Sequence, residues 1–180
     1  MYKIMKRVQS LRGFTLIEMM LAIAIILMMT TLIFSTFYIV NSSHARVAVI
    51  NDAKDYAALN MDSINRLVVN SEQIKLTDPV PTDYTKLYYD DSVLKYGTGE
   101  IAFEQYKLAD GRPKWRIKST YKGVGLMLSV RLDVYDNSTS NLSDVAAHPY
   151  YTLTRSIYLP NNNEEIVGTG SDLYYKIPVF

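Results

Sequence analysis

A long apolar segment near the N-terminus constrains the fold of this chain more than any other feature. Residues 14–40 read FTLIEMMLAIAIILMMTTLIFSTFYIV and contain a single charged residue, Glu18. At about 1.5 Å per residue, a helix of this length reaches roughly 40 Å, which is enough to cross a hydrocarbon core of about 30 Å. An ordinary secretory signal has an apolar region of only about 7–15 residues. The segment therefore predicts a membrane-spanning helix.

The residues that precede this segment are strongly basic. Residues 1–13, MYKIMKRVQSLRG, contain no acid and carry a charge of +4 from Lys3, Lys6, Arg7 and Arg12. Because the whole chain has a net charge of +1, the remaining residues sum to −3. Basic flanks stay on the cytoplasmic side of a membrane. We therefore expect a single-pass protein of the cytoplasmic membrane, with its N-terminus in the cytoplasm and its C-terminal part outside.

Glu18 is the one feature that an ordinary membrane anchor does not explain. A carboxylate in an apolar helix costs about 2.5–3.5 kcal/mol at the bilayer centre and less near an end. One interpretation is that Glu18 snorkels towards Arg12 or the lipid headgroups. The residues immediately around it favour a second interpretation.

The string Arg12-Gly13-Phe14-Thr15-Leu16-Ile17-Glu18 resembles the signature of the type IV pilin superfamily, in which a basic leader and a glycine precede Phe and a spaced Glu. The superfamily includes pilus subunits and the pseudopilins of competence and type II secretion systems, and the resemblance covers about residues 1–40. It implies that prepilin peptidase cuts between Gly13 and Phe14, that Phe14 is N-methylated, and that Glu18 is needed for assembly. It also implies the partners: other pilin or pseudopilin subunits, prepilin peptidase, an inner-membrane assembly platform, and membrane lipid before assembly. After assembly the chain would lie in a cell-surface pilus or pseudopilus.

The implied role of Glu18 has a physical reason. Cleavage creates an ammonium group at Phe14 in or near an apolar environment, where a cation needs a partner. Glu18 of an adjacent subunit can supply that partner, and four residues of helix give a stagger of about 6 Å. Such a pair fixes the register of neighbouring subunits more than it adds stability.

Two departures from the best-known pilins bear on whether the chain is a major or a minor subunit. Many major pilins carry Gly or Pro within the apolar helix and close a C-terminal loop with a disulfide, whereas residues 14–40 contain neither Gly nor Pro and the chain has no Cys. Both departures favour a minor pilin or a pseudopilin. A single-span, membrane-anchored extracytoplasmic binding protein that is not assembled into a filament is the alternative.

Beyond residue 40 the apolar residues follow a helical period. One stripe has spacings of three or four residues, which predicts an amphipathic continuation of the same helix to about residue 72; its members are Val47, Ile50, Ala53, Ala57, Met61, Ile64 and Val68. The expected organisation is a leader at 1–13, a membrane or filament-core helix at 14–40, an amphipathic helix at 41–72 and a β-sheet head at 73–180.

The head shows alternating periods typical of strands. The clearest run is 126–134, which has an all-aliphatic face and predicts a central strand. Residues 150–159 and 172–180 predict two more strands, and Pro178 makes the last an edge or terminal strand. Asp110-Gly111 predicts a hairpin between 101–108 and 114–121. Residues 160–171 read as a polar loop with turn glycines. The fold class is therefore α+β: a long N-terminal helix packed on an antiparallel sheet of four to six strands, as the pilin resemblance also implies.

No constellation of catalytic residues is present in the sequence. GxSxG, HExxH, P-loop and GxGxxG motifs are all missing, and His44 and His148 lie far apart. We expect no enzyme activity, no catalytic residue, no metal and no cofactor, and we interpret the acids at 90–91 and 164–165 as solvated loop residues and not as calcium ligands. The near balance of 19 basic and 18 acidic residues gives no reason to expect nucleic-acid binding.

Overall fold

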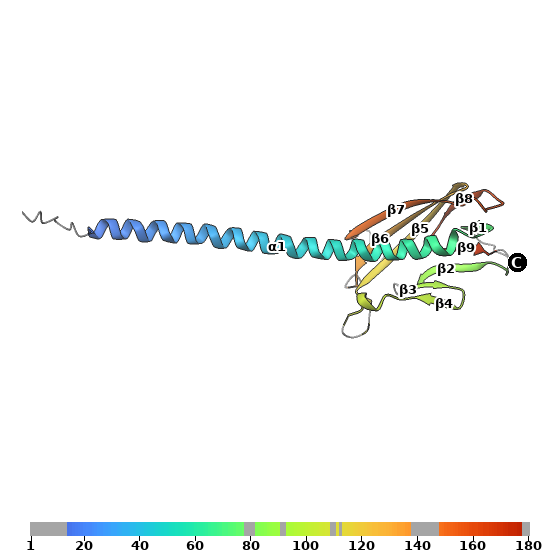
Figure 1. Cartoon of the computed structure of the whole chain (residues 1–180), viewed down its shortest axis with the longest axis horizontal. Coiled ribbons are helices and arrows are strands. Elements are labelled where there is room, and N and C mark those ends of the chain that lie inside the picture. Colours follow the sequence, from blue (N-terminus) through green and yellow to red (C-terminus); the bar gives the residue numbers. More distant parts are fainter. Residues whose placement is uncertain are drawn as a thin grey trace, which may run out of the picture. The chain divides into compact units, whose positions relative to one another are not determined.

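The computed structural model of the chain describes residues 14–77, 82–90, 93–108, 111, 113–137 and 148–177. One long helix, α1 (Leu16–Val68), precedes two antiparallel sheets (Figure 1). This arrangement confirms the α+β class predicted from the sequence. The leader at 1–13 and Pro178 lie outside the described residues.

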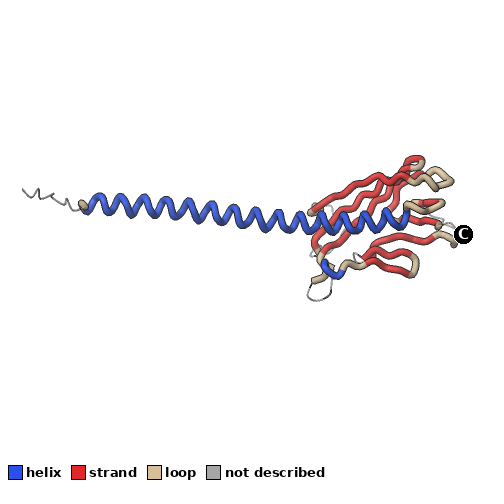
Figure 2. The backbone as a smooth tube through the Cα atoms, viewed as in Figure 1, coloured by secondary structure: helices blue, strands red, loops and turns tan. Residues whose placement is uncertain are grey.

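The chain divides into two compact units, Met1–Arg46 and Val47–Phe180, and the division falls within α1. In the first unit, the described residues are helical from Leu16 onward. The second unit contains the remaining turns of α1 and the strands. Figure 2 shows these last helical turns running along the strands.

α1 continues to Val68 because no glycine or proline interrupts residues 14–68. It ends slightly before residue 72, the expected end. Ser71 explains this end, since its backbone N–H and its hydroxyl both donate to the Val68 carbonyl, at 3.0 and 2.7 Å. These bonds satisfy a carbonyl that lacks a partner within the helix.

The first sheet has five strands in the order β1-β9-β2-β3-β4. Most of its strands are short, with bounds of Gln73–Lys75 for β1, Thr85–Asp90 for β2, Val93–Tyr96 for β3, Gly99–Ile101 for β4 and Leu173–Lys176 for β9. A short 3-10 helix, η1 (Glu104–Tyr106), follows β4.

The second sheet has four strands in the order β7-β6-β5-β8. Its strands are β5 (Trp115–Gly125), β6 (Met127–Asp136), β7 (Tyr151–Tyr158) and β8 (Ile166–Gly170). The predicted strands near 126–134 and 150–159 are confirmed as β6 and β7. β6 lies between β5 and β7, as its aliphatic face predicted, and that face is fully buried through Leu128, Val130, Leu132 and Val134.

The amphipathic stripe of α1 supplies the helical side of the core. Its last five members, Ala53, Ala57, Met61, Ile64 and Val68, have no exposed surface. Val47 and Ile50 remain 52% and 38% exposed, so the burial predicted for the stripe holds from Ala53 onward. Burying these apolar side chains against both sheets supplies much of the driving force for folding the second unit, at about 25 cal/mol per Å².

The buried face of α1 is wider than the stripe, because it also includes Tyr56 and Asn60. Asn60 is 1% exposed and satisfies its amide locally. Its Nδ2 donates to the Tyr56 carbonyl at 2.9 Å, and its Oδ1 accepts from the Tyr89 hydroxyl at 3.2 Å. The second bond ties α1 to β2 through a polar group that the apolar pattern could not identify.

The predicted hairpin around Asp110-Gly111 is wrong. Residues 101–108 contribute only the end of β4 and then η1, and a single bridge joins Lys107 to Pro113. Phe103 and Tyr106 are three residues apart and both pack on Tyr56, with ring centroids 6.0 and 4.9 Å away. This aromatic contact with α1 replaces strand pairing.

The tight hairpin lies instead between β5 and β6. Val124 pairs with Met127, so Gly125 and Leu126 form a two-residue turn, and Gly125 has the positive φ of 61° that such turns require. The strand run read from Leu126 therefore begins one residue later, at Met127.

Two further expectations about the C-terminal segment need correction. Residues 160–171 are not only loop, because β8 pairs with β5. Gly170 lies within β8, where a Cβ atom would come within 2.4 Å of the Leu76 carbonyl oxygen, so this glycine permits close approach and does not make a turn. In addition, β9 is the last strand of the described chain, but it lies between β1 and β2 and is not an edge strand; it ends at Lys176, before Pro178.

Asp52 connects α1 to the start of β5. Its Oδ2 accepts from Trp115 Nε1 at 3.2 Å and forms an ion pair with Lys114 Nζ. The Trp115 ring is 2% exposed and contacts Tyr150 edge-on, with ring centroids 5.7 Å apart. The carboxylate thus satisfies an indole N–H on a ring that is otherwise almost wholly in the core.

Replacing Asp52 by alanine is expected to destabilise the second unit by about 1–3 kcal/mol, because the buried indole N–H loses its acceptor. Thermal unfolding of the full chain in detergent micelles, followed by the fluorescence of Trp115, measures the loss. Asp55→Ala removes the same charge from an exposed position one helical turn later and should change the midpoint little. Equal shifts for the two variants would contradict a specific role for Asp52.

Candidate functional site

The start of α1 forms a reciprocal cap between Thr15 and Glu18. Glu18 Oε2 accepts from the Thr15 backbone N–H at 2.8 Å and from the Thr15 hydroxyl at 2.9 Å. The Glu18 backbone N–H donates to Thr15 Oγ1 at 3.3 Å. This is a capping box, in which residues three apart satisfy donors that the first helical turn leaves free.

The capping box gives Glu18 a partner within its own chain. The carboxylate also lies at the helix N-terminus, where the aligned peptide dipoles favour negative charge. A carboxylate in the first turn is therefore better stabilised than one in the middle of an apolar helix. The interpretation that Glu18 snorkels to Arg12 is not needed to explain its presence.

The predicted cleavage and methylation residues lie beside this cap. Phe14 directly precedes Thr15 and is 81% exposed. Gly13 lies outside the described residues. The structure thus places Phe14 and Glu18 within one turn of the helix start, with Thr15 between them as a residue that the analysis of the sequence did not single out. The signal for Thr15 is nevertheless readable, since Thr-x-x-Glu before an apolar run is the pattern of a capping box.

The helix after this cap is apolar on every side. All residues from 14 to 40 are exposed, and α1 is long and apolar enough to cross a membrane. A helix of this kind needs lipid or other apolar helices around it. The large exposed apolar side chains are found along its whole length, from Leu16 to Val40.

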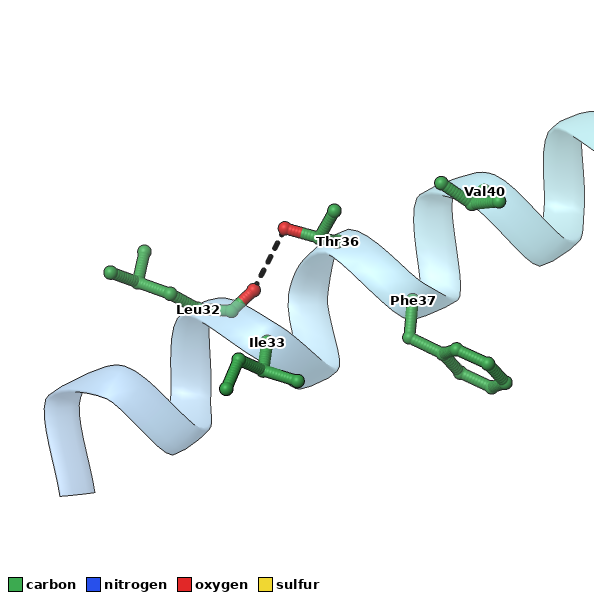
Figure 3. Close-up of a pocket in the computed structure, with 5 residues that line it drawn as sticks. All are labelled: Leu32, Ile33, Thr36, Phe37 and Val40. Carbon is green, nitrogen blue, oxygen red and sulfur yellow. Dashed lines mark hydrogen bonds between the residues drawn. The ribbon is translucent and has the colours of Figure 1, made fainter. Parts of the chain in front are cut away.

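Three threonine hydroxyl groups in this apolar segment are satisfied by the helix itself. Thr30, Thr31 and Thr36 donate to the carbonyls four residues earlier, at 2.7, 2.8 and 2.9 Å. Figure 3 shows the bond from Thr36 to the Leu32 carbonyl. These bonds remove the cost of unpaired hydroxyls in a medium without water.

A shallow hollow on the same helix is lined by Leu32, Ile33, Thr36, Phe37 and Val40. Its side chains project outward from a single helix, and Thr36 already uses its hydroxyl (Figure 3). The hollow is therefore a contact surface for apolar groups and offers no free polar group that would orient a small ligand.

The acids considered as calcium ligands have other partners. Asp90 pairs with Lys95 at 2.6 Å, and Glu164 Oε1 accepts from Gln73 at 3.2 Å; Asp91 lies outside the described residues. His44 and His148 are both exposed. In the described part of the chain, no group of three or more His, Asp or Glu residues could hold a metal ion.

Comparison with known proteins identifies the N-terminal segment. Residues 10–34 match the family model of the prokaryotic N-terminal methylation motif. No curated protein and no solved structure matches the chain. The motif spans the Gly-Phe junction, the capping box and the apolar segment as far as residue 34. It suggests a structural protein that interacts with other pilin subunits and is processed by a peptidase. The chain therefore carries the type IV prepilin-like signature at its N-terminus, together with a helix that fits membrane anchoring.

Proposed function

We propose that this protein is a structural subunit, and a minor one, of a type IV pilus or a related pseudopilus. In this proposal residues 1–13 are a leader that prepilin peptidase removes, and residues 14–40 serve first as a membrane anchor and then as part of the filament core. The observation that carries the proposal is the methylation motif at 10–34, which extends into a helix that is apolar on every side as far as residue 40. The second unit would face outward as the head.

The proposal assigns two successive partners to the exposed apolar surface of α1. Lipid covers it before assembly, and the α1 helices of neighbouring subunits cover it afterwards. The transfer is energetically reasonable because lipid tails and aliphatic side chains are about equally apolar, so that packing and polar contacts decide association. The buried partner for Glu18 is then the ammonium of Phe14 on an adjacent subunit.

Processing tests the proposal most directly. When the chain is produced together with an active prepilin peptidase, its intact mass should correspond to a chain that begins at Phe14, with one methyl group added. Gly13→Leu should remain full-length, because a side chain there obstructs close approach of the peptidase to the backbone. Recovery of unprocessed native chain alongside a processed control pilin would count strongly against the proposal.

The rank of the subunit is tested by its abundance. α1 runs without a break through residues 16–68, whereas many major pilins carry breakers in the apolar helix. The strands of the head also differ widely in length, from three to eleven residues, which suits a specialised position more than a contact repeated at every subunit. Quantitative mass spectrometry of sheared filaments should find this chain at a small fraction of the most abundant subunit. If it is the most abundant, the minor rank is wrong and the filament role stands.

A further inference from the structure

The four-stranded sheet presents a polar surface on the side away from the core. Along β5 and β6 buried and outward residues alternate, and β7 pairs in register beside them (Figure 1). We call this surface the outer face. Most of its members carry cations or hydroxyl groups: Arg116, Lys118, Thr120, Lys122, Ser129, Arg131, Asp133, Thr152, Thr154, Ser156 and Thr169. The last row of the face, beside the turn between β5 and β6, is instead apolar or aromatic and exposed: Val124, Met127, Tyr158 and Val167.

The charge of the outer face is opposite to that of the chain around it. The outer face carries four cations, and the only acids on it or next to it in the described strands are Asp133 and Asp136. In contrast, the charges of residues 14–180 together sum to −3. Asp133 is 6% exposed, and its carboxylate already accepts from Arg131 Nε at 3.1 Å and from the Thr152 hydroxyl at 2.6 Å. Lys118 lies opposite Asp133 in the ladder but forms no ion pair with it.

Lys118 and Lys122 are the cations that lack a counter-charge. Both are exposed on β5, and neither forms an ion pair in the part of the chain that the structure describes. Four residues along a strand separate them by about 13 Å. They therefore present two separate positive charges on a flat surface, with Thr120 between them on the same strand.

Most lysines of the first sheet, in contrast to Lys118 and Lys122, are paired with carboxylates. Three of its four lysines have carboxylate partners: Lys86 with Asp172 at 2.8 Å, Lys95 with Asp90 at 2.6 Å and Lys176 with Asp83 at 2.5 Å. The fourth, Lys75, lies over the Tyr84 ring, 5.3 Å from its centroid. The bond from Lys176 also holds the pKa of Asp83 below its ordinary value. Three lysines of the first sheet are thus paired with carboxylates, whereas Lys118 and Lys122 of the outer face have no carboxylate partner among the described residues.

The groups around Lys118 and Lys122 indicate what kind of anion fits. The hydroxyls of Thr154, Ser156 and Thr169 are exposed and can exchange hydrogen bonds with a polyhydroxylated ligand. Nucleic-acid bases stack on exposed aromatic rings, and in the described strands this face offers one such ring, Tyr158 of β7, which is 58% exposed, whereas Tyr135 is only 8% exposed. Duplex DNA also carries a charge about every 1.7 Å, which two lysines about 13 Å apart match poorly.

We propose that the outer face binds an acidic polysaccharide, with Lys118 and Lys122 pairing with its carboxylates and the threonine and serine hydroxyls of β7 and β8 contacting its sugar hydroxyls. The ligand class is a chain with hydroxyl groups on every residue and sparse negative charge. This inference goes beyond the filament role, because it concerns the second unit alone and does not depend on assembly.

The test uses the full chain in detergent micelles and immobilised polygalacturonate, with dextran as a neutral polymer and duplex DNA as a competing polyanion. Polygalacturonate should bind, with an affinity that falls as salt rises, and both other polymers should bind at least roughly tenfold more weakly. The double variant Lys118→Gln, Lys122→Gln should bind polygalacturonate about tenfold more weakly than the native chain.

A matched control separates the site from net charge. Lys95→Gln with Lys176→Gln removes the same charge from the first sheet and should leave binding within about twofold. Thr154→Val keeps the shape of an exposed strand residue, removes one hydroxyl, and should weaken binding about threefold. Absence of binding to polygalacturonate, equal losses in the two double variants, or tighter binding of DNA would each overturn the proposal.

Discussion

The second unit is expected to lose stability steeply as the pH rises above about 10, the ordinary pKa of tyrosine. Burial raises the pKa of Tyr121, which has no exposed surface, and it raises the pKa of Tyr89 well above the ordinary value. This loss of stability should precede any effect on the apolar helix of residues 14–40, which contains no buried tyrosine.

The direction of this pH dependence follows from comparing the folded and the unfolded chain. Below pH 10 both tyrosines are neutral whether the chain is folded or unfolded, so their contribution to stability is fully present. Above pH 10 the unfolded chain releases protons that the folded chain still holds, and the free energy of unfolding falls until the pH reaches the folded pKa. Each pH unit in that window removes about 1.4 kcal/mol per tyrosine.

Tyr121→Phe isolates the effect. Its hydroxyl is buried and has no hydrogen-bond partner of normal geometry among the described residues, so phenylalanine keeps the packing and removes the titrating group. Thermal midpoints followed by circular dichroism from pH 8 to 12 should fall less steeply for this variant than for the native chain. Tyr158→Phe, at a position that is 58% exposed, should leave the native profile unchanged. Parallel profiles for the native chain and Tyr121→Phe would contradict the argument.

The features that the sequence predicted well are those with a long, regular period. α1 extends over 53 residues, and buried residues of β6 alternate with exposed or half-buried ones from Met127 to Leu132. In a pattern of this length, a few residues that break the period do not hide it. The signature around Phe14 and Glu18 was readable for a different reason, because charge, glycine, aromatic and acid coincide within a few residues.

The short strands could not be predicted in the same way. β1 and β4 have three residues each, too few to show an alternation, and they exist because neighbouring strands pair with them. β8 contains two glycines, which in isolation indicate turns. Only the close approach of Leu76 to Gly170 explains a strand there, and that contact is far from local in sequence.

The misplaced hairpin illustrates competition between two local signals. Asp110-Gly111 and Gly125-Leu126 both fit a tight turn between alternating runs. The aromatic contacts of Phe103 and Tyr106 with Tyr56 decide between them, because they draw the run before Asp110 onto α1. A tertiary contact thus overrides a turn propensity.

Replacing Glu18 by alanine is expected to leave the protein in the membrane and processed at Gly13, but to remove it almost entirely from filaments. Loss of the carboxylate should ease insertion, since an acid in an apolar helix is costly. A failure to assemble then cannot arise from a worse anchor. If Glu18 pairs with the Phe14 ammonium of an adjacent subunit, removing one partner of that buried pair costs about 3–5 kcal/mol, more than about a hundredfold in an equilibrium.

The capping box complicates this variant, because alanine also removes the cap on Thr15. Glu18→Gln resolves the ambiguity. A glutamine at this position of a capping box can still accept from the Thr15 N–H, but it carries no charge to neutralise an ammonium. If charge pairing drives assembly, the glutamine variant should be missing from sheared filaments as completely as the alanine variant, while both are processed and membrane-bound.

Thr15→Val provides the reverse test, since it removes the hydroxyl of the cap and keeps the Glu18 carboxylate. This variant should lose only the stability that a helix cap contributes, about 0.5–2 kcal/mol. Its incorporation into filaments should therefore fall far less than that of Glu18→Gln. Quantitative mass spectrometry of filaments from cells that carry each variant compares the three directly. Normal incorporation of Glu18→Gln together with strong loss for Thr15→Val would show that Glu18 acts only by starting the helix, and it would sink the pairing argument.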